Sequence, residues 1–179
     1  IMNLVKNIMP YVKNLKEKLT QVYEKPQSDD EKILKKYLDE TIEDFQNTIF
    51  NKFTDNLQKV FIDSYVQVLV YGIFMGWLRY SKPNGEKGVF SLDVVTSYLP
   101  SGSLMQSLFS EIKNYITEDE LKTIFDPIFE CFNRTEYQDI SKIIDDLMNE
   151  FYSDFLELYD KEEKKKFGVC LLYTSPSLR

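Results

Sequence analysis

Residues 66–78, VQVLVYGIFMGWL, form the most apolar stretch of this 179-residue chain. The stretch is shorter than the roughly 20 residues that a membrane-spanning helix needs. It also contains Gln67 and follows Asp63, both of which are polar. We therefore predict a helix buried in the protein core rather than a membrane span, with Leu69 and Phe74 among its buried residues.

Apolar residues recur at helical spacing on both sides of this stretch, and no alternating run is long enough to predict a strand. The pattern predicts an all-α fold, an irregular helical bundle whose core is unusually aromatic, since 15% of the residues are aromatic. Helices are expected at residues 3–24, from 28 toward 53, from 54 or 55 to 80, from 91 to 99, from 104 to 115, from 117 across Pro127, and through 140–158.

Several of these helix ends carry recognisable signals. Residues 28–31, SDDE, and residues 117–120, TEDE, are capping boxes, in which a hydroxyl and a carboxylate satisfy free N–H groups at a helix start. Ser91 is expected to cap the short helix that follows it. Pro10 is expected to kink or split the first helix, because proline interrupts the backbone hydrogen bonds.

The composition narrows the possible functions. The formal net charge is −7, and an acidic chain repels phosphate, so we do not expect the main nucleic-acid surface here. The chain has no His, which excludes His-based acid–base chemistry and His metal ligands within it. Cys131 and Cys170 form no CxxC motif and suggest a reducing, cytoplasmic location rather than a disulfide framework.

No glycine-rich phosphate loop and no nucleophile elbow occur in the sequence. We therefore assign no catalytic, cofactor-binding or metal-binding residue. The carboxylate pairs Asp145–Asp146 and Glu162–Glu163 point about 100° apart on a helix, so we interpret them as solvated surface.

Four lysines near the end of the last predicted helix are weak candidates for contacts with DNA phosphates. We favour the alternative that they complement the negative end of that helix. The four residues are Lys161, Lys164, Lys165 and Lys166.

The beginning of the apolar helix admits two interpretations. Its polar residues, Asp63, Ser64, Tyr65 and Gln67, could form a polar site. We favour a structural interpretation, in which Asp63 and Gln67, four positions apart, share one exposed or interfacial stripe.

The end of the same helix carries four aromatic residues, Tyr71, Phe74, Trp77 and Tyr80. Their rings could stack on a nucleic-acid base. At helical spacing, however, aromatic residues are more often part of the core, which is the interpretation that we favour.

Two stretches resemble a known family. Residues 61–74 read FIDSYVQVLVYGIF, and residues 151–160 read FYSDFLELYD, followed by KKKFGV at 164–169. Both resemble the helical segment of single-polypeptide restriction-modification enzymes, the type IIG and type I single-polypeptide groups. In that family a basic run and a G-V-Y-Y-T-P loop then open the methyltransferase domain. The order and spacing match from about residue 61 to 169, but CLL replaces the expected YYTP.

The resemblance implies a parent enzyme that methylates adenine N6 with S-adenosylmethionine through an Asn-Pro-Pro-Tyr loop beyond this chain. It also implies a Mg²⁺-dependent nuclease domain before residue 1, and double-stranded DNA as the parent's partner. No cofactor is expected in this fragment, whose partners would be the adjacent methyltransferase and nuclease domains. The alternative is a free-standing acidic helical interaction protein.

The resemblance divides the chain into three parts. Residues 1–56 match the family only in being helical. Residues 57–169 are the predicted coupler, a non-catalytic helical spacer that leads into the methyltransferase domain. Residues 170–179 resemble translated sequencing-adapter read-through, with a natural frayed terminus as the alternative.

Overall fold

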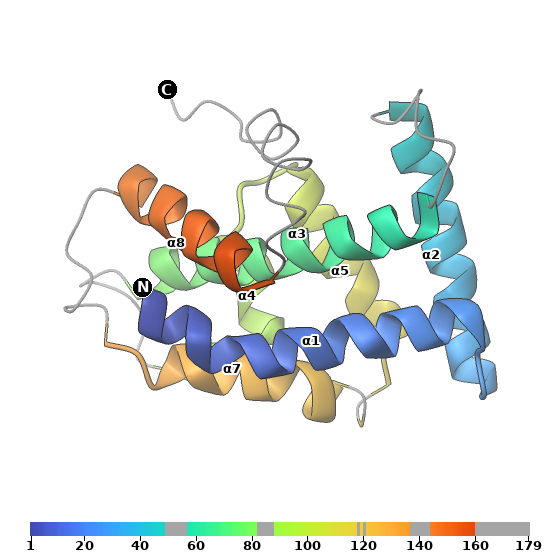
Figure 1. The fold of residues 1–179 in the computed structure, drawn as a ribbon, viewed down its shortest axis with the longest axis horizontal. Helices are drawn as coiled ribbons and strands as arrows, with labels where there is room; N and C mark the ends of the chain where they lie inside the picture. Colours follow the sequence, from blue (N-terminus) through green and yellow to red (C-terminus); the bar gives the residue numbers. More distant parts are fainter. Residues whose placement is uncertain (49–56, 82–87, 118, 120, 137–143, 160–179) are drawn as a thin grey trace.

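The computed structural model describes residues 1–48, 57–81, 88–117, 119, 121–136 and 144–159. These residues form seven α-helices and one π-helical turn and contain no strand, which confirms the predicted all-α fold (Figure 1). The elements are α1 (Met2–Glu24), α2 (Asp29–Thr48), α3 (Leu57–Tyr80), α4 (Leu92–Tyr98), α5 (Leu104–Tyr115), the π-helical turn η1 (Leu121–Phe125), α7 (Asp126–Asn133) and α8 (Ile144–Tyr159).

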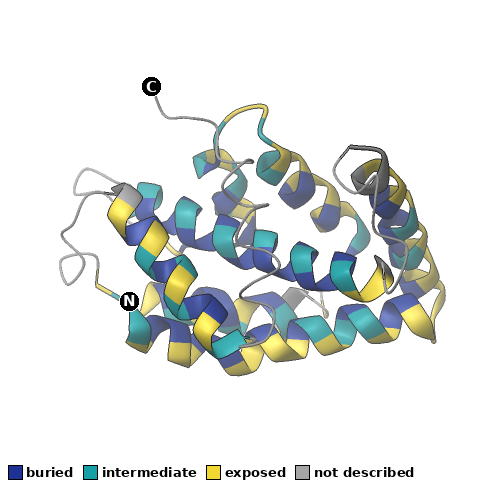
Figure 2. Cartoon of the chain, turned by 45° about the horizontal axis from the view of Figure 1, so that its top comes forward, coloured by how far each residue is buried: buried dark blue, intermediate teal, exposed yellow. Residues whose placement is uncertain are grey.

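Helix α3 contacts α1, α4, α5, α7 and α8, so it forms the centre of the bundle. Figure 2 shows buried residues along much of the length of α3. By length and composition α3 could cross a membrane, but 72% of its most apolar window is buried inside the protein. Leu69 and Phe74 have no exposed surface, which confirms the prediction that they are buried. This burial is the pattern of a core helix that is apolar on nearly every side.

Two glycines allow neighbouring helices to approach α3 closely. A Cβ atom added at Gly72 would lie 2.5 Å from the Phe109 ring of α5, and one added at Gly76 would lie 2.6 Å from a methyl group of Val95 in α4. Close-packed interiors leave no space for such an atom. The absence of side chains at these two positions therefore sets how near α4 and α5 lie to α3.

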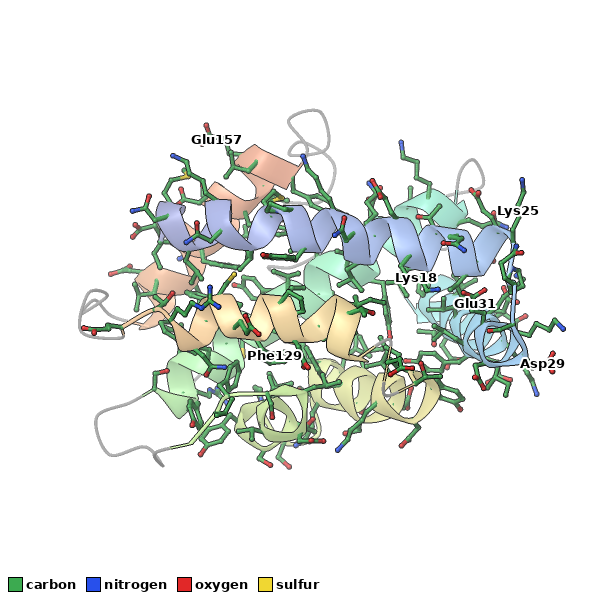
Figure 3. The ribbon with its side chains drawn as sticks, turned by 90° about the horizontal axis from the view of Figure 1, so that it is seen from below. Lys18, Lys25, Asp29, Glu31, Phe129 and Glu157 are labelled. Carbon is green, nitrogen blue, oxygen red and sulfur yellow. The ribbon has the colours of Figure 1, made fainter. Side chains whose placement is uncertain are left out.

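A capping box fixes the turn between α1 and α2. The Ser28 hydroxyl accepts a hydrogen bond from the Glu31 N–H at 3.1 Å, as predicted. The Glu31 carboxylate accepts from the N–H of Gln27 rather than from that of Ser28, and it also pairs with Lys18 of α1. Figure 3 shows Lys18 and Glu31 near each other, close to the end of α1.

Helices α4 and α5 begin differently. Ser91 occupies the N-cap position of α4, as predicted, but its side chain makes no capping hydrogen bond. Its carbonyl instead accepts the N–H group of Val95 at 2.9 Å. Helix α5 begins with a capping box that the sequence analysis missed. Ser103 accepts from the Gln106 N–H at 3.2 Å, and the Gln106 side chain accepts from the Gly102 N–H at 2.9 Å.

The two prolines inside predicted helices have different effects. Helix α1 continues through Pro10 as one helix, so the predicted split does not occur. Pro127 lies in the first turn of α7, directly after η1. Proline has no N–H, and its ring crowds the carbonyl four residues earlier. The wider π turn accommodates both defects, so the helix predicted across Pro127 consists of η1 and α7.

Asn133, the last residue of α7, holds the segment that leads into α4. Its side-chain oxygen accepts from the Phe90 N–H at 3.0 Å, and its side-chain nitrogen donates to the Phe90 carbonyl at 2.8 Å. One amide thus satisfies both backbone groups of Phe90, which has no regular secondary structure to do so. This contact places the fully buried Phe90 ring against Phe129 of α7.

Two predictions about side-chain burial are wrong, and several other predictions fall on residues outside the described part of the chain. Helical spacing with their apolar neighbours predicts that Ile33 and Tyr11 lie on apolar helix faces, but they are 53% and 37% exposed. Ile33 is adjacent to the buried Leu34, and neighbours on a helix point about 100° apart, so only one of them faces the core. The predicted cap of α3 at residues 54–55, two residues of the second capping box and residues 140–143 lie outside the described residues.

Candidate functional site

Asp63 and Gln67 of α3 are buried, with 0% and 3% of their surface exposed. Of the two alternatives for their stripe, the exposed one is therefore wrong, and the interfacial one agrees with the contacts of Asp63. Asp63 contacts α1 and α8, both of which pack against α3. Because α3 is apolar on its other faces too, its pattern does not reveal which face points to solvent. A buried carboxylate in such a helix makes this region the candidate site.

Three helices meet at one oxygen of the Asp63 carboxylate. Asp63 Oδ1 forms an ion pair with Lys16 Nζ of α1. The same oxygen accepts a hydrogen bond from the Tyr159 hydroxyl of α8 at 3.0 Å. Lys16 Nζ also lies 5.1 Å from the centre of the Tyr159 ring, a cation–π distance. We call Lys16, Asp63 and Tyr159 the carboxylate cluster.

The cluster is energetically sensitive because its carboxylate is removed from water. The Lys16 side chain is 29% exposed, whereas the Asp63 side chain is 0% exposed. Taking a carboxylate out of water costs several kcal/mol, which the ion pair and the charge-assisted hydrogen bond offset. Removing one partner of a buried pair costs about 3–5 kcal/mol, because the remaining charge is then uncompensated.

Other polar atoms in this part of α3 have no hydrogen-bond partner among the described residues. Asp63 Oδ2, Ser64 Oγ and Gln67 Nε2 are buried and make no hydrogen bond. Buried polar atoms of this kind usually bind ordered water. The chemistry that the site offers is therefore hydrogen bonding and charge pairing.

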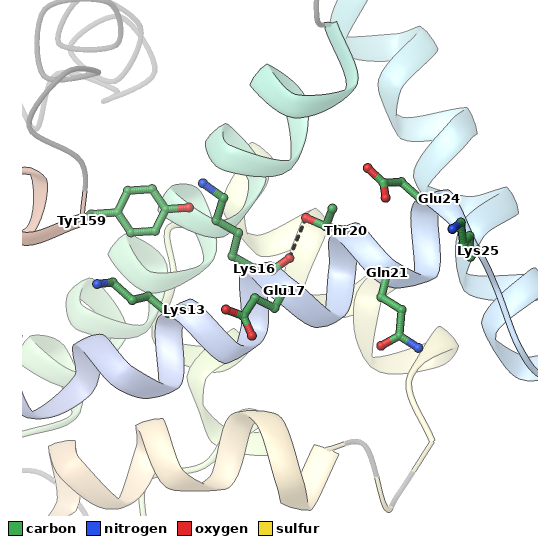
Figure 4. Close-up of a pocket in the computed structure, with 8 residues that line it drawn as sticks. All are labelled: Lys13, Lys16, Glu17, Thr20, Gln21, Glu24, Lys25 and Tyr159. Carbon is green, nitrogen blue, oxygen red and sulfur yellow. Dashed lines mark hydrogen bonds between the residues drawn. The ribbon is translucent and has the colours of Figure 1, made fainter.

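A pocket of about 550 Å³, lined by charged and polar residues, lies along α1 beside the carboxylate cluster (Figure 4). Lys16 and Tyr159 line the pocket and also hold Asp63, so the buried carboxylate lies next to its wall. The lining mixes lysines and glutamates and therefore gives no strong preference for one sign of ligand charge. The remaining lining residues are Lys13, Glu17, Thr20, Gln21, Glu24 and Lys25.

Several titratable groups outside the carboxylate cluster have shifted pKa values, and they lie where helices pack against one another. The Lys18 ammonium and two backbone N–H groups hold the pKa of Glu31 below its usual 4.5. Burial raises the pKa of Tyr23 to about 12. Burial also raises the pKa of Tyr65 well above 10, and its hydroxyl lies 3.2 Å from that of Tyr37. Among the described residues, no group of three or more Cys, Asp or Glu side chains is placed to hold a metal ion.

The aromatic residues of α3 pack inside the protein. Phe74 and Trp77 are 0% and 2% exposed, which confirms the core interpretation for these two. Tyr71 and Tyr80 are half-buried and pack against the same core. The Phe74 ring stacks on Phe151 of α8, with 3.9 Å between ring centres.

The remaining predicted surface residues are only partly described. Asp146 is exposed, as predicted. Cys131 is a free, half-buried thiol, while Cys170 lies outside the described residues. The Asp145 side chain and the pair at 162–163 also lie outside what the structure describes. The same is true of the four candidate DNA-contacting residues, Lys161, Lys164, Lys165 and Lys166.

Comparison of the chain with protein-family models, with curated proteins and with solved structures found no match. Sequence reasoning singled out Asp63 and Gln67 but missed Lys16 and Tyr159, because these partners come from distant parts of the chain. One available signal is a charged residue in a helix that is otherwise apolar on every face, since such a charge needs a buried partner.

Proposed function

We propose that this chain is the helical coupler that leads into the adenine-specific methyltransferase domain of a single-polypeptide restriction-modification enzyme. In this role it is not itself catalytic. The neighbouring domains would use S-adenosylmethionine and Mg²⁺ on double-stranded DNA in the cytoplasm. The coupler would hold these domains at a fixed spacing, a role that depends on packing rather than on reactive side chains.

One observation supports this proposal more than any other. The two stretches that carry the family resemblance, residues 61–74 in α3 and 151–159 in α8, contact each other. Phe74 and Phe151 are stacked with an angle of 8° between their rings, and Tyr159 donates a hydrogen bond to Asp63. Stretches that belong to one spacer are expected to pack as one unit.

A second candidate is a free-standing acidic helical protein that binds another macromolecule. The net charge of −7 and the pocket along α1 favour it. This candidate would need no neighbouring domain, so the two proposals differ in what surrounds the chain in an intact gene.

The reading frame of an intact genomic copy distinguishes the two candidates. The coupler predicts a nuclease-like segment before this chain and an Asn-Pro-Pro-Tyr loop after it. Stop codons close to both ends would contradict the coupler and favour the free-standing protein.

A binding measurement tests whether this chain lacks cofactor chemistry. Because the sequence has no glycine-rich cofactor loop, isothermal titration calorimetry of the purified chain with S-adenosylmethionine should give no binding heat. Binding at micromolar affinity would show that a cofactor site exists within these residues and that the coupler assignment is wrong.

A further inference from the structure

Apolar packing alone leaves the position of α8 along its neighbours poorly determined. Phe151, Phe155 and Tyr159 follow one another at a spacing of four residues, and each ring packs on the next, with 6.1 Å and 5.1 Å between ring centres. If α8 moved by one turn, about 5.4 Å, so that Phe155 took the place of Tyr159, Phe151 would take the place of Phe155, and the apolar Leu147 would lie beside Phe74. The rings would still be buried, so the apolar contacts would change little.

The carboxylate cluster makes such a shift unfavourable. Four residues before Tyr159 is Phe155, which has no hydroxyl group to donate to Asp63. A one-turn shift of α8 in that direction therefore leaves the buried carboxylate without its neutral donor. The free-energy cost of an unsatisfied buried acceptor is larger than the net free energy that the hydrogen bond contributes.

The same argument applies to α1. The residues three and four positions after Lys16 are Leu19 and Thr20, neither of which carries a charge. A one-turn shift of α1 that brings these residues to Asp63 would therefore leave the carboxylate buried without its counter-ion.

We propose that the carboxylate cluster fixes the register of α1 and α8 against α3, and that this positioning, rather than added stability, is its role. A buried ion pair often contributes less stability than apolar side chains of similar volume. A single buried polar group can nevertheless select one register of packed helices, as it does in coiled coils. Tyr159 is the last described residue of α8, so the cluster also positions this part of the helix relative to α1 and α3. The proposal concerns the isolated chain and does not depend on the coupler assignment.

The test replaces the whole cluster with apolar residues, as Lys16→Met, Asp63→Leu and Tyr159→Phe together. Spin labels are attached at Asn14→Cys of α1 and Ser153→Cys of α8, both exposed positions, after both native cysteines are changed to serine. Double electron–electron resonance then measures the distance between the labels. We expect one narrow distance peak for the unchanged cluster.

For the triple variant we expect a denaturation midpoint that is unchanged or higher, together with a second peak displaced by about one helical turn, roughly 5 Å. A single peak at the original distance in a folded triple variant would overturn the proposal.

A milder variant decides the question if the triple variant does not fold. Tyr159→Phe removes only the hydroxyl, and losing a hydrogen bond to a charged group should shift the ratio of the two arrangements by about tenfold or more. The matched control is Tyr11→Phe, which removes a hydroxyl from an exposed side chain of α1. Identical distance distributions for these two variants would overturn the proposal.

Discussion

Gly76 illustrates how a single missing side chain shapes the bundle. An added Cβ atom would lie 2.6 Å from a methyl group of Val95, and valine is stiff at χ1 and cannot easily turn aside. We expect Gly76→Ala to lower the free energy of unfolding. Overpacking costs about 1–3 kcal/mol, which outweighs the roughly 0.5–1 kcal/mol gained in helix propensity.

A double-mutant cycle with Val95→Ala checks this explanation by chemical denaturation. If the clash with Val95 is the cause, Gly76→Ala should cost less in the Val95→Ala background than in the unchanged chain. An equal cost in both backgrounds would show that another contact is responsible.

Glu31 should contribute to acid sensitivity. Its pKa in the folded protein is lowered from 4.5, mainly by the Lys18 ammonium, so the unfolded chain takes up the proton first as the pH falls. Its contribution to stability is therefore fully present above pH 4.5 and is lost as the pH falls through the lower, folded value. We expect the free energy of unfolding to fall less between pH 7 and pH 3 in Glu31→Gln than in the unchanged chain.

The matched control for this measurement is Glu157→Gln, which neutralises an exposed carboxylate on α8. It should show the same pH dependence as the unchanged protein. A Glu31→Gln variant that cannot be distinguished from this control would mean that the Lys18 contact does not stabilise the fold.

Single residues of the site were only partly predictable. Helical spacing places Asp63 and Gln67 on one side of α3, which sequence reasoning found. It does not tell whether that side is buried, because the covering residues Lys16 and Tyr159 come from α1 and α8. An ion pair between distant segments leaves no local periodic signal, so the partner of a buried charge becomes visible only in the folded protein.

Between elements, the Asn133 side chain connects α7 to the segment before α4. Asn133→Ala removes both hydrogen bonds to the Phe90 backbone. At about 0.5–1.5 kcal/mol for each bond, we expect a loss of about 1–3 kcal/mol in chemical denaturation. Asn149→Ala, at an exposed position in α8, is the matched control and should change stability little. Equal effects of the two changes would contradict the proposed connection.

Helix boundaries were predicted well where local chemistry defines them. The Ser28–Glu31 bond begins α2, as predicted, and α5 covers the predicted residues 104–115. The π turn before Pro127 was not predicted, because periodicity identifies a helical segment but not the width of one turn. Whether proline continues or interrupts a helix depends on how the preceding turn relaxes, as the contrast between Pro10 and Pro127 demonstrates.

At the scale of the whole molecule, helix α1 at the beginning of the chain packs against α7 and α8 near its end. The fold class followed from periodicity, but this arrangement did not. Each amphipathic helix specifies that one face is covered and does not specify which helix covers it. Non-local pairing is therefore the part of the fold that the sequence patterns left open.

Deleting residues 170–179 should change the free energy of unfolding by less than about 0.5 kcal/mol, the range typical of changes away from structural features. The segment lies outside the described residues, so this prediction uses the sequence alone: it has no helical periodicity and follows a lysine-rich run. Thermal denaturation of the full and shortened chains provides the measurement. A loss of several kcal/mol would show that the tail belongs to the fold.

The central position of α3 also has a consequence for the synthesis of the protein. Of the helices that contact α3, α1 and α2 precede it in the chain, while α4, α5, α7 and α8 follow it. A ribosome adds about 5–20 residues per second, so the roughly 80 residues between the ends of α3 and α8 take about 4–16 s to make. During that interval one side of an apolar helix has no cover, and we expect ribosome-bound chains stalled at this stage to recruit a chaperone more strongly than finished chains. Equal recruitment in a co-sedimentation assay would mean that α1 and α2 are enough to shield the nascent helix.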